Sequence, residues 1–267
     1  MYLLFDIGAT NMRIAVSHDG ETILEQKIIS TPFDFDEGIK AFKNGARELC
    51  GDMIINAAAG GVPGILNKDK TVLLSAPNLE KWEDVFLKEA LEKALDVPVH
   101  LENDAVLAAL GEAVFGAGKE KRIVAYFTVS TGVGGARVVG GRLDESASGL
   151  EPGRQVVDGV HTLEYHISGN GIKKRYGKSP EDIEDPAMWE EAARWLAIGV
   201  NNAIALWSPE IFVLGGAVMR HRIAVADVKR QVEAFGNFPE FPEIVAAQLG
   251  DMSGLYGALA LIRSFKK

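Results

Sequence analysis

The sequence has a single cysteine, Cys50, among its 267 residues. One thiol cannot form an intrachain disulfide, and it cannot supply the cysteine cluster of a structural zinc site. A basic run is also absent, and the net charge of −9 argues against a nucleic-acid groove. An acidic protein can still bind an anionic nucleotide, because such a site is local. We find no low-complexity segment and no repeat of solenoid period.

Long apolar runs are absent too. No stretch is long enough to span a bilayer, and the first residues lack the basic segment and apolar core of a signal peptide. We therefore expect a cytoplasmic protein without membrane contact. The chain opens on its first expected strand, which leaves no room for an N-terminal DNA-binding domain. Its 267 residues allow one large domain or two modest lobes, and a hydrophobic content of 47% is enough for a core.

The most informative segment runs from Tyr2 to Gly20, YLLFDIGATNMRIAVSHDG. Its apolar stretches predict two antiparallel strands joined by a tight turn, then a second turn at 18–20 and a third strand at 22–24. Gly8 gives the first turn backbone freedom. Successive backbone N–H groups of this turn, with the Thr10 hydroxyl, form a concave anion site. A carboxylate beside phosphates needs a cation, so Asp6 suggests Mg²⁺ held through water. The alternative is an ordinary hairpin in which Asp6 caps the turn.

The pattern Asp6-x-Gly8-x-Thr10-x-x-Arg13 resembles the first phosphate hairpin of the sugar kinase, actin and Hsp70 ATPase superfamily. The resemblance implies that these four residues and Asn11 bind ATP, with Mg²⁺ near Asp6. The hairpin by itself does not distinguish the branches of the superfamily.

Polar residues follow the next expected strands. The glycine-rich segment 60–64 should form a loop after a strand at 52–59. A later loop presents Asn78, whose amide can both donate and accept hydrogen bonds, as recognition of a sugar hydroxyl requires. Asn103 and Asp104 lie at the C-terminal end of a strand, where α/β folds place ligands. Asp104 could accept the proton of an attacking hydroxyl, or it could simply cap the following helix.

Gly64, Pro77-Asn78-Leu79 and Asn103-Asp104, in this order after the first hairpin, resemble the sugar side of the ROK-family kinases and the related bacterial glucokinases. The resemblance implies that Asp104 is the catalytic base. It also implies that Gly64, Asn78 and Asn103 bind the sugar.

A second strand–turn–strand unit follows at 121–139, with the glycine-rich segment 130–136 as its expected turn. Its likeness to the first hairpin implies that Thr131, Gly132 and Gly134 face the β- and γ-phosphates of ATP. Gly215 and Gly216 follow a buried strand, and the resemblance places this pair at the adenosine. Without a Cβ the backbone can lie against a flat base, although a tight strand–helix turn needs the same glycines.

The segment 151–171 departs from the family pattern. The resemblance predicts Glu-x-Gly-His, and Glu151 matches, but Arg154 replaces the histidine with a larger and always charged side chain. The zinc-binding cysteine cluster of the family is missing, so we expect no zinc site. Glu164 matches the glutamate that contacts the sugar near its anomeric carbon. Glu151, Arg154 and Glu164 are therefore expected sugar ligands. His161 could replace the missing histidine, or it could be a surface or capping residue.

The resemblance implies an α/β protein with the two-lobed ribonuclease H-like ATPase fold of actin and hexokinase and an interlobe cleft. We expect a small lobe of residues 1–112 and about 252–267, and a large lobe of residues 113–251. The expected reaction is ATP- and Mg²⁺-dependent phosphorylation of a hexose, most simply glucose at its 6-hydroxyl. Sugar and ATP are the expected partners, and a homodimer is possible.

Three alternatives stay open. Another small kinase of the superfamily, such as a type III pantothenate kinase, has a similar first hairpin, but the segments around Asn78 and Asn103 argue against it. An N-acetylglucosamine or N-acetylmannosamine kinase of the same family would differ in pocket volume at the sugar 2-position. A non-catalytic sugar sensor could have arisen through Arg154, although a sensor needs no catalytic base at Asp104. A phosphoryl donor other than ATP is also left open.

Overall fold

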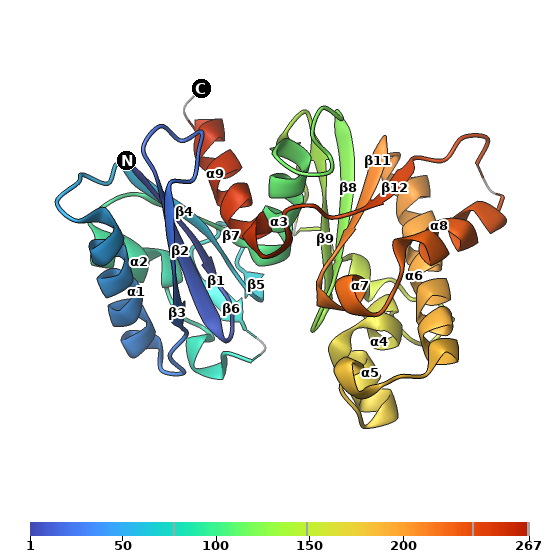
Figure 1. Ribbon diagram of the computed structural model, residues 1–267. Coiled ribbons are helices and arrows are strands. Elements are labelled where there is room, and N and C mark those ends of the chain that lie inside the picture. The colour runs from blue at the N-terminus through green and yellow to red at the C-terminus, as the bar shows by residue number, and fades with distance from the viewer. Residues whose placement is uncertain (77, 148, 237, 266–267) are drawn as a thin grey trace. The chain divides into compact units, whose positions relative to one another are not determined.

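The computed structural model describes residues 1–76, 78–147, 149–236 and 238–265. The chain divides into two compact units, which are described separately. Unit 1 comprises Met1–Val114 and Asp251–Lys267, and unit 2 comprises Phe115–Gly250. Each unit is built around one five-stranded sheet (Figure 1). Within the described ranges, none of the helices combines the length and the apolar character that crossing a bilayer requires.

The sheet of unit 1 has the strand order β3-β2-β1-β4-β7. Its strands are β1 (Tyr2–Ile7), β2 (Asn11–Ser17), β3 (Glu25–Ser30), β4 (Ala57–Val62) and β7 (Val99–Asn103). β1, β2 and β3 pair antiparallel, whereas β4 pairs parallel with both β1 and β7. A small two-stranded sheet contains β5 (Ile65–Leu66) and β6 (Leu73–Ser75). The helices of the unit are α1 (Phe35–Cys50), α2 (Leu87–Leu95), α3 (Asp104–Val114) and α9 (Ser253–Phe265).

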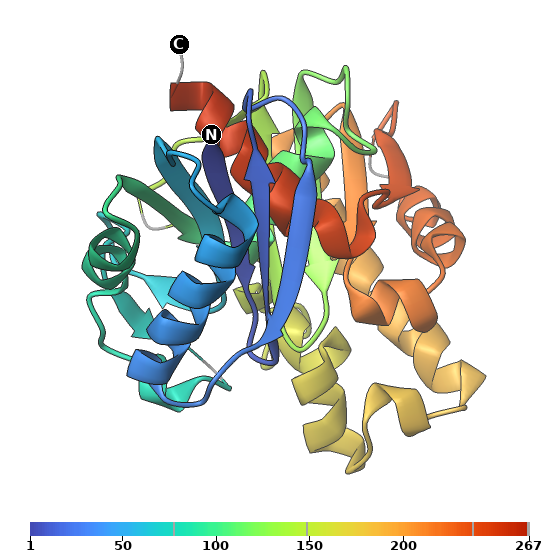
Figure 2. The same cartoon turned by 60° about the vertical axis from the view of Figure 1, so that its left-hand side comes forward.

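Helices cover both faces of the middle of this sheet, so the inner strands β1 and β4 are buried on both sides, whereas the edge strand β3 is largely exposed. Leu3, Phe5 and Ile7 of β1 are fully buried in a core that includes residues of α1 and α2. Leu4, which points to the opposite face, is fully buried as well, and α9 contacts β1 and β4. Figures 1 and 2 show α1 and α2 on one face and α3 and α9 on the other.

The sheet of unit 2 has the order β10-β9-β8-β11-β12. Its strands are β8 (Ile123–Val129), β9 (Val133–Val139), β10 (Arg142–Leu143), β11 (Ile211–Gly215) and β12 (Glu243–Ala246). β8 and β9 form an antiparallel hairpin, and β11 pairs parallel with β8 and β12. The helices are α4 (Leu163–Ile167), α5 (Gly169–Tyr176), α6 (Pro186–Trp207), α7 (Ala217–His221) and α8 (Val225–Ala234). The apolar stripe of α6 lies in the core of this unit.

Two glycine-rich segments that were expected to be loops are parts of strands. β4 continues through Gly60 and Gly61, and β9 includes Gly134 and Gly135. A Cβ on Gly60 would lie 2.2 Å from the ring of Phe5, and one on Gly135 would lie 2.3 Å from a backbone oxygen. The loop expectation was wrong because these glycines are needed for close packing, which local sequence does not reveal.

The third strand of unit 1 was also misplaced. β3 begins at Glu25, not in segment 22–24. The carboxylate of Asp19 accepts hydrogen bonds from the backbone N–H groups of Glu21 (2.8 Å) and Thr22 (3.0 Å). These bonds extend the turn, so the strand starts later than the apolar residues suggested.

Candidate active site

The first hairpin turn connects β1 to β2 and is held by backbone hydrogen bonds. The N–H of Gly8 donates to the carbonyl of Asn11 at 2.8 Å. Thr31 ties the turn to the end of β3, since its N–H donates to the Thr10 carbonyl (2.9 Å) and its Oγ1 to the Gly8 carbonyl (2.7 Å). Thr10 itself is exposed.

Gly8 serves this turn in another way than expected. It is not among the glycines with a positive φ in the described part of the chain. A Cβ at this position would instead lie only 3.0 Å from the carbonyl oxygen of Asn11. The glycine is therefore needed for close backbone approach across the turn, and conformational freedom is not the reason.

Asp6 lies at the C-terminal end of β1, opposite Arg13 in the β1–β2 register. Its Oδ2 is 4.0 Å from Nη1 of Arg13, whose Nη2 is 3.7 Å from Oδ2 of Asp251. The first turn of α9 lies beside the Asp6 carboxyl group, because a Cβ on Gly254 would be 2.8 Å from its Cγ. Burial raises the pKa of Asp6 to about 6, the Arg13 charge opposes this shift, and the Asp251 charge adds to it.

Asp104 is the first residue of α3 and follows β7 directly. Burial and then the nearby negative charge of Asp6 raise the pKa of Asp104 to about 7. The backbone N–H of Ala105 donates to Oδ1 of Asp104 at 2.8 Å, which offsets the shift only partly. Asp104 is therefore a carboxyl group that can both hold and release a proton near neutral pH.

Asn103 performs the capping that we had considered for Asp104. Its Oδ1 accepts hydrogen bonds from the N–H groups of Ala105 (2.9 Å) and Val106 (3.2 Å) at the start of α3. Its Nδ2 donates to the carbonyl of Gly64 at 2.9 Å, so one amide hydrogen is left for a ligand.

Glu102 is a buried carboxylate that the sequence did not single out. Its Oε1 accepts the N–H of Asn103 at 2.9 Å, and its Oε2 pairs with Nζ of Lys70. The pair fixes the backbone immediately before Asp104. Lys70 and Glu102 are 32 positions apart, and no local pattern links them.

Two further sugar-side positions of unit 1 have left-handed backbone angles. Gly64 has φ of 103°, and a Cβ there would lie 2.0 Å from the carbonyl oxygen of Ser75. Asn78 has φ of 75° and is exposed. Asparagine tolerates this region better than other side chains do. Pro77, part of the same expected segment, lies outside the described residues.

The second hairpin turn, in unit 2, is held by the segment where α4 meets α5. The N–H groups of Gly169 and Asn170 donate to the carbonyls of Ser130 (2.8 Å) and Thr131 (3.0 Å). Thr131, like Thr10 of the first hairpin, is exposed.

The carboxylate of Glu164 lies directly at this turn. Its Oε2 accepts the backbone N–H of Val133 at 2.8 Å. A Cβ on Gly132 would lie 2.9 Å from the same oxygen, so a side chain there would require the Glu164 carboxylate to move. An expected sugar ligand thus also holds the expected phosphate turn in place, and Oε2 already accepts one hydrogen bond.

Glu151 precedes a short 3₁₀ turn, Pro152–Arg154, and Arg154 is its last residue. Arg154 Nε is 3.8 Å from Glu151 Oε2, and the side chains are 67% and 51% exposed. A pair this exposed contributes little to stability, so both side chains are available to a ligand. Gly153 between them packs under β9, since a Cβ would lie 2.5 Å from the carbonyl oxygen of Val133.

Gly215 and Gly216 join β11 to α7. Gly216 has φ of 98°, and a Cβ there would lie 2.2 Å from the carbonyl oxygen of Val129. A Cβ on Gly215 would lie 2.5 Å from the hydroxyl of Tyr126. The turn itself therefore requires Gly216, and a side chain at Gly215 would have to displace the Tyr126 hydroxyl.

His161, considered as a replacement for the missing family histidine, lies in the loop before α4. Its Nδ1 is 2.9 Å from Oδ2 of Asp158, and its ring stacks on Tyr165 with a centroid distance of 4.2 Å. The structure therefore pairs His161 with Asp158 and Tyr165.

Unit 1 brings Asp6, Asp104 and Asp251 into one electrostatic group with Arg13 as the cation facing Asp6. The group is short of positive charge, and carboxylates are ligands that Mg²⁺ prefers. Asp6 is therefore suited to hold Mg²⁺ through water. No local pattern points to Asp251 and Gly254, because they come close to Asp6 and Arg13 only through the return of the chain to unit 1 at α9.

Comparison with known proteins identifies the relatives of this chain. A family model described as ROK family matches residues 2–264. A glucokinase from Streptomyces coelicolor is 29% identical, over 97% of this chain and 96% of its own length. A bifunctional NanE/NanK enzyme from Brucella melitensis is 32% identical, over 98% of this chain and 54% of its own length.

A solved structure supports the same assignment. The ROK family glucokinase from Streptomyces griseus, in complex with glucose and AMPPNP, matches with a TM-score of 0.80 and 26% identity. The match covers 98% of this chain and 99% of that chain. The predicted hexokinase-type ATPase fold is confirmed, and the predicted enzyme class, an ATP-dependent sugar kinase, is that of these relatives. The chain belongs to the ROK family.

Proposed function

We propose that this protein transfers the γ-phosphoryl group of ATP to a hexose hydroxyl, with the 6-hydroxyl of glucose as its preferred acceptor. One observation carries the proposal most directly. Asp104 lies at the C-terminal end of β7, and burial with the nearby Asp6 charge raises its pKa to about 7. A base with a pKa near the working pH takes a proton efficiently and releases it again after the reaction.

In the proposed reaction, Asp104 accepts the proton of the attacking hydroxyl while Asn103 donates its remaining amide hydrogen to the sugar. Asn103 is fixed by its bonds to α3 and to Gly64, so this donor has a defined direction. Gly64 and Asn78 complete the sugar contacts of unit 1, and unit 2 supplies Glu151, Arg154 and Glu164.

The triphosphate of ATP is bound by backbone N–H groups of the two hairpin turns and by the exposed hydroxyls of Thr10 and Thr131. Arg13 supplies positive charge beside Asp6. Mg²⁺, held through water at Asp6, would neutralise phosphate charge. Gly215 and Gly216 would lie against the adenosine. The remaining proposed contacts to ATP come from Gly8, Asn11, Gly132 and Gly134.

Glucose is the first choice because the Streptomyces coelicolor relative is a glucokinase and the Streptomyces griseus structure holds glucose with AMPPNP, an ATP analogue. An N-acetylglucosamine or N-acetylmannosamine kinase, the alternative that the sequence leaves open, is the second candidate, and the relative with the higher identity, 32%, is the bifunctional NanE/NanK enzyme rather than a glucokinase. These sugars differ from glucose at the 2-position, so comparing acceptors separates the candidates.

The test is ADP release by the purified chain with Mg-ATP and each of glucose, mannose, fructose, N-acetylglucosamine and N-acetylmannosamine. Asp104→Asn runs beside it, with Asp52→Asn, an exposed acid of the same unit, as the matched control. We expect glucose-dependent turnover that falls about 100-fold or more in D104N and stays unchanged in D52N.

Two other outcomes would contradict parts of the proposal. Near-normal turnover by D104N would remove Asp104 from the role of base. An absence of turnover with every sugar would contradict the kinase proposal, and Arg154 would then be the first position to examine.

A further inference from the structure

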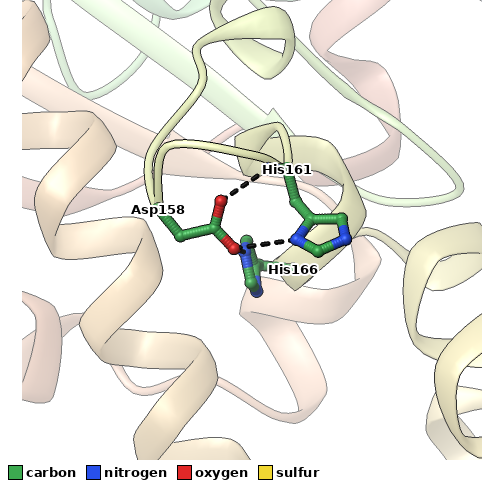
Figure 3. A group of neighbouring side chains, drawn as sticks. All are labelled: Asp158, His161 and His166. Carbon is green, nitrogen blue, oxygen red and sulfur yellow. Dashed lines mark hydrogen bonds and ion pairs between the residues drawn. The ribbon is translucent and has the colours of Figure 1, made fainter.

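Three side chains with metal-binding atoms converge in unit 2, outside the residues assigned to sugar and ATP. They are Asp158 and His161, from the loop before α4, and His166, from α4 (Figure 3). One ligand atom from each lies within 4.8 Å of the others. Oδ2 of Asp158 is 2.9 Å from Nδ1 of His161 and 3.0 Å from Nε2 of His166, and both rings point at that oxygen (Figure 3).

The loop is built so that Asp158 keeps this oxygen for the histidines. Its other oxygen, Oδ1, accepts the backbone N–H groups of Val160 (2.8 Å) and His161 (2.5 Å). A carboxyl group of ordinary pKa is already ionised at neutral pH, and Oδ2 of Asp158 faces the two imidazole nitrogens, so Asp158 can act as a metal ligand.

Packing fixes the two imidazole rings. His166 is buried and stacks on Trp195 with a centroid distance of 4.1 Å, and His161 stacks on Tyr165. The side chain of His161 is 43% exposed, which leaves a route from solvent to the cluster. The ligands are thus oriented in advance, on a loop and a helix whose positions are already set.

The distances suit a metal ion after a small movement. Ligand atoms of a tetrahedral zinc ion, each about 2.0–2.1 Å from the metal, lie about 3.3 Å from one another. The two N–O distances of 2.9 and 3.0 Å must therefore lengthen by a few tenths of an ångström. The two imidazole nitrogens, which lie within 4.8 Å of each other, must also come to about 3.3 Å, and rotation of the more exposed His161 ring allows this. Without a metal, both rings can donate hydrogen bonds to Oδ2 of Asp158. The experiment below distinguishes this hydrogen-bonded cluster from a metal site.

We propose that Asp158, His161 and His166 form a site for a divalent transition metal, with Zn²⁺ as its best occupant. Two imidazoles and one carboxylate are a common ligand set for Zn²⁺ and leave one position for water. The earlier expectation of no zinc site followed from the missing cysteines, and this ligand set needs none. The metal would connect the loop before α4 to α4 itself. α4 also carries Glu164, whose carboxylate accepts the N–H of Val133 at the second hairpin turn.

His166 also sets the expected strength of the site. Binding through Nε2 places its proton on Nδ1, and that atom is buried without a hydrogen-bond partner among the described residues. Metal-binding histidines usually donate this N–H to an outer acceptor, and losing that acceptor costs about 10- to 100-fold in affinity. We therefore expect binding weaker than that of closed structural zinc sites.

The test is equilibrium dialysis of the full chain, first stripped with a chelator, against ZnCl₂ in excess Mg²⁺, with bound zinc measured by elemental analysis. We expect one zinc ion per chain. His161→Ala and Asp158→Asn each remove a metal ligand and should weaken zinc binding by about 100-fold or more. Loss of a group that only hydrogen-bonds to a metal ligand already weakens binding by up to about 100-fold. His221→Ala, an exposed histidine of the same unit outside the cluster, is the matched control and should bind as the unmodified chain does.

D158N also separates metal binding from loop structure. An asparagine keeps an oxygen for the N–H groups of Val160 and His161, so the loop should stay folded without zinc. In hydrogen exchange, we expect zinc to protect segment 156–167 of the unmodified chain and to leave D158N unchanged. Zinc binding that is equally strong in H161A and D158N, or no zinc bound by the unmodified chain, would overturn the proposal.

Discussion

At the scale of single residues, the fold of unit 1 raises the pKa of two carboxyl groups, those of Asp6 and Asp104. Burial is the largest cause of the raised pKa in both. The negative charge of Asp6 then raises the pKa of Asp104 further. A site that concentrates negative charge in this way favours protons, or a bound cation in their place.

The first prediction concerns stability and follows from this shift. The pKa of Asp104 is about 7 in the folded chain, against an ordinary value of 3.8. Between about pH 4 and pH 7 the folded state holds a proton that the unfolded state has released, so the free energy of unfolding falls as pH rises. D104N removes this cost. We expect its Tm to exceed that of the unmodified chain by about 3 °C or more at pH 8, and by much less at pH 5.

Thermal melts at the two pH values, with D52N as control, measure the effect. A difference in Tm that does not depend on pH would show that Asp104 has an ordinary pKa in the folded chain.

The second prediction concerns activity. Asp104 must be ionised to accept a proton, so kcat/KM for the sugar, at saturating Mg-ATP, should fall about tenfold per pH unit on the acidic side of its pKa. The inflection should lie at or below about pH 7, because a cation bound at Asp6 favours the ionised form. Initial rates from pH 5 to 8.5 test this. A profile without an acidic limb would contradict the assignment of the base.

The third prediction tests Glu164, which has two proposed tasks. Glu164→Gln keeps an oxygen that can accept the N–H of Val133, whereas Glu164→Ala leaves that N–H without a partner. An unpaired, partly buried backbone group costs about 1–3 kcal/mol. We expect E164A to be destabilised by that amount in urea unfolding and E164Q to be nearly unchanged. Both variants should raise KM for the sugar. Equal stability of the two would mean that the turn does not depend on this bond.

At the scale of elements, the packing of α3 against α9 brings together the group of Asp6, Asp104 and Asp251. A Cβ on Gly257 would lie 1.9 Å from the carbonyl oxygen of Leu107, and one on Gly111 would lie 2.4 Å from that of Ser253. The two helices therefore meet backbone to backbone. This contact connects the helix that begins at Asp104 to the helix whose first turn lies beside Asp6.

The fourth prediction is that Gly257→Ala separates these helices. The added methyl group has no space, and overpacking of this kind costs about 1–3 kcal/mol, occasionally more. Urea unfolding should show the loss, and turnover should fall as well because Asp6 and Asp104 move apart. Ser264→Ala, at the exposed end of the same helix, should change stability by less than about 0.5 kcal/mol. Unaltered stability of G257A would contradict the close contact.

At the scale of the whole molecule, the chain forms two cores, and unit 1 is discontinuous in sequence. Its last helix, α9, arrives only after the chain has completed unit 2. In unit 1, α9 packs on α3, β1 and β4. Unit 1 is therefore incomplete until the end of the chain has been made, whereas unit 2 is continuous.

The fifth prediction follows from this order. A chain truncated after Gly250 lacks α9, and the buried face of β1 and β4 loses its cover. In hydrogen exchange we expect loss of protection in β1, β4 and α3, while β8 and β11 of unit 2 keep theirs. A chain truncated after Phe265 is the control and should match the full chain. Retained protection in β1 without α9 would show that unit 1 does not need its last helix.

Much of this protein could be predicted from sequence. The apolar runs around Asp6–Asn11 predicted the first hairpin, which is confirmed. The family, the ATPase fold and the enzyme class followed from the order of the motifs and are confirmed. The roles of individual sugar and ATP ligands stay predictions.

The sequence by itself determined the elements and the family, because hydrophobic periodicity and turn residues act over a few positions and motif order survives in the chain. Tertiary structure alone decided which glycines are strand residues, that Asn103 caps α3, that Asp251 acts on the pKa of Asp6, and that Glu102 bonds to the backbone N–H of Asn103. It also decided the raised pKa of Asp104 and the meeting of Asp158 with His166. The physical reason is the same for all of these: burial, close packing and charge act between groups that meet only after the chain has folded.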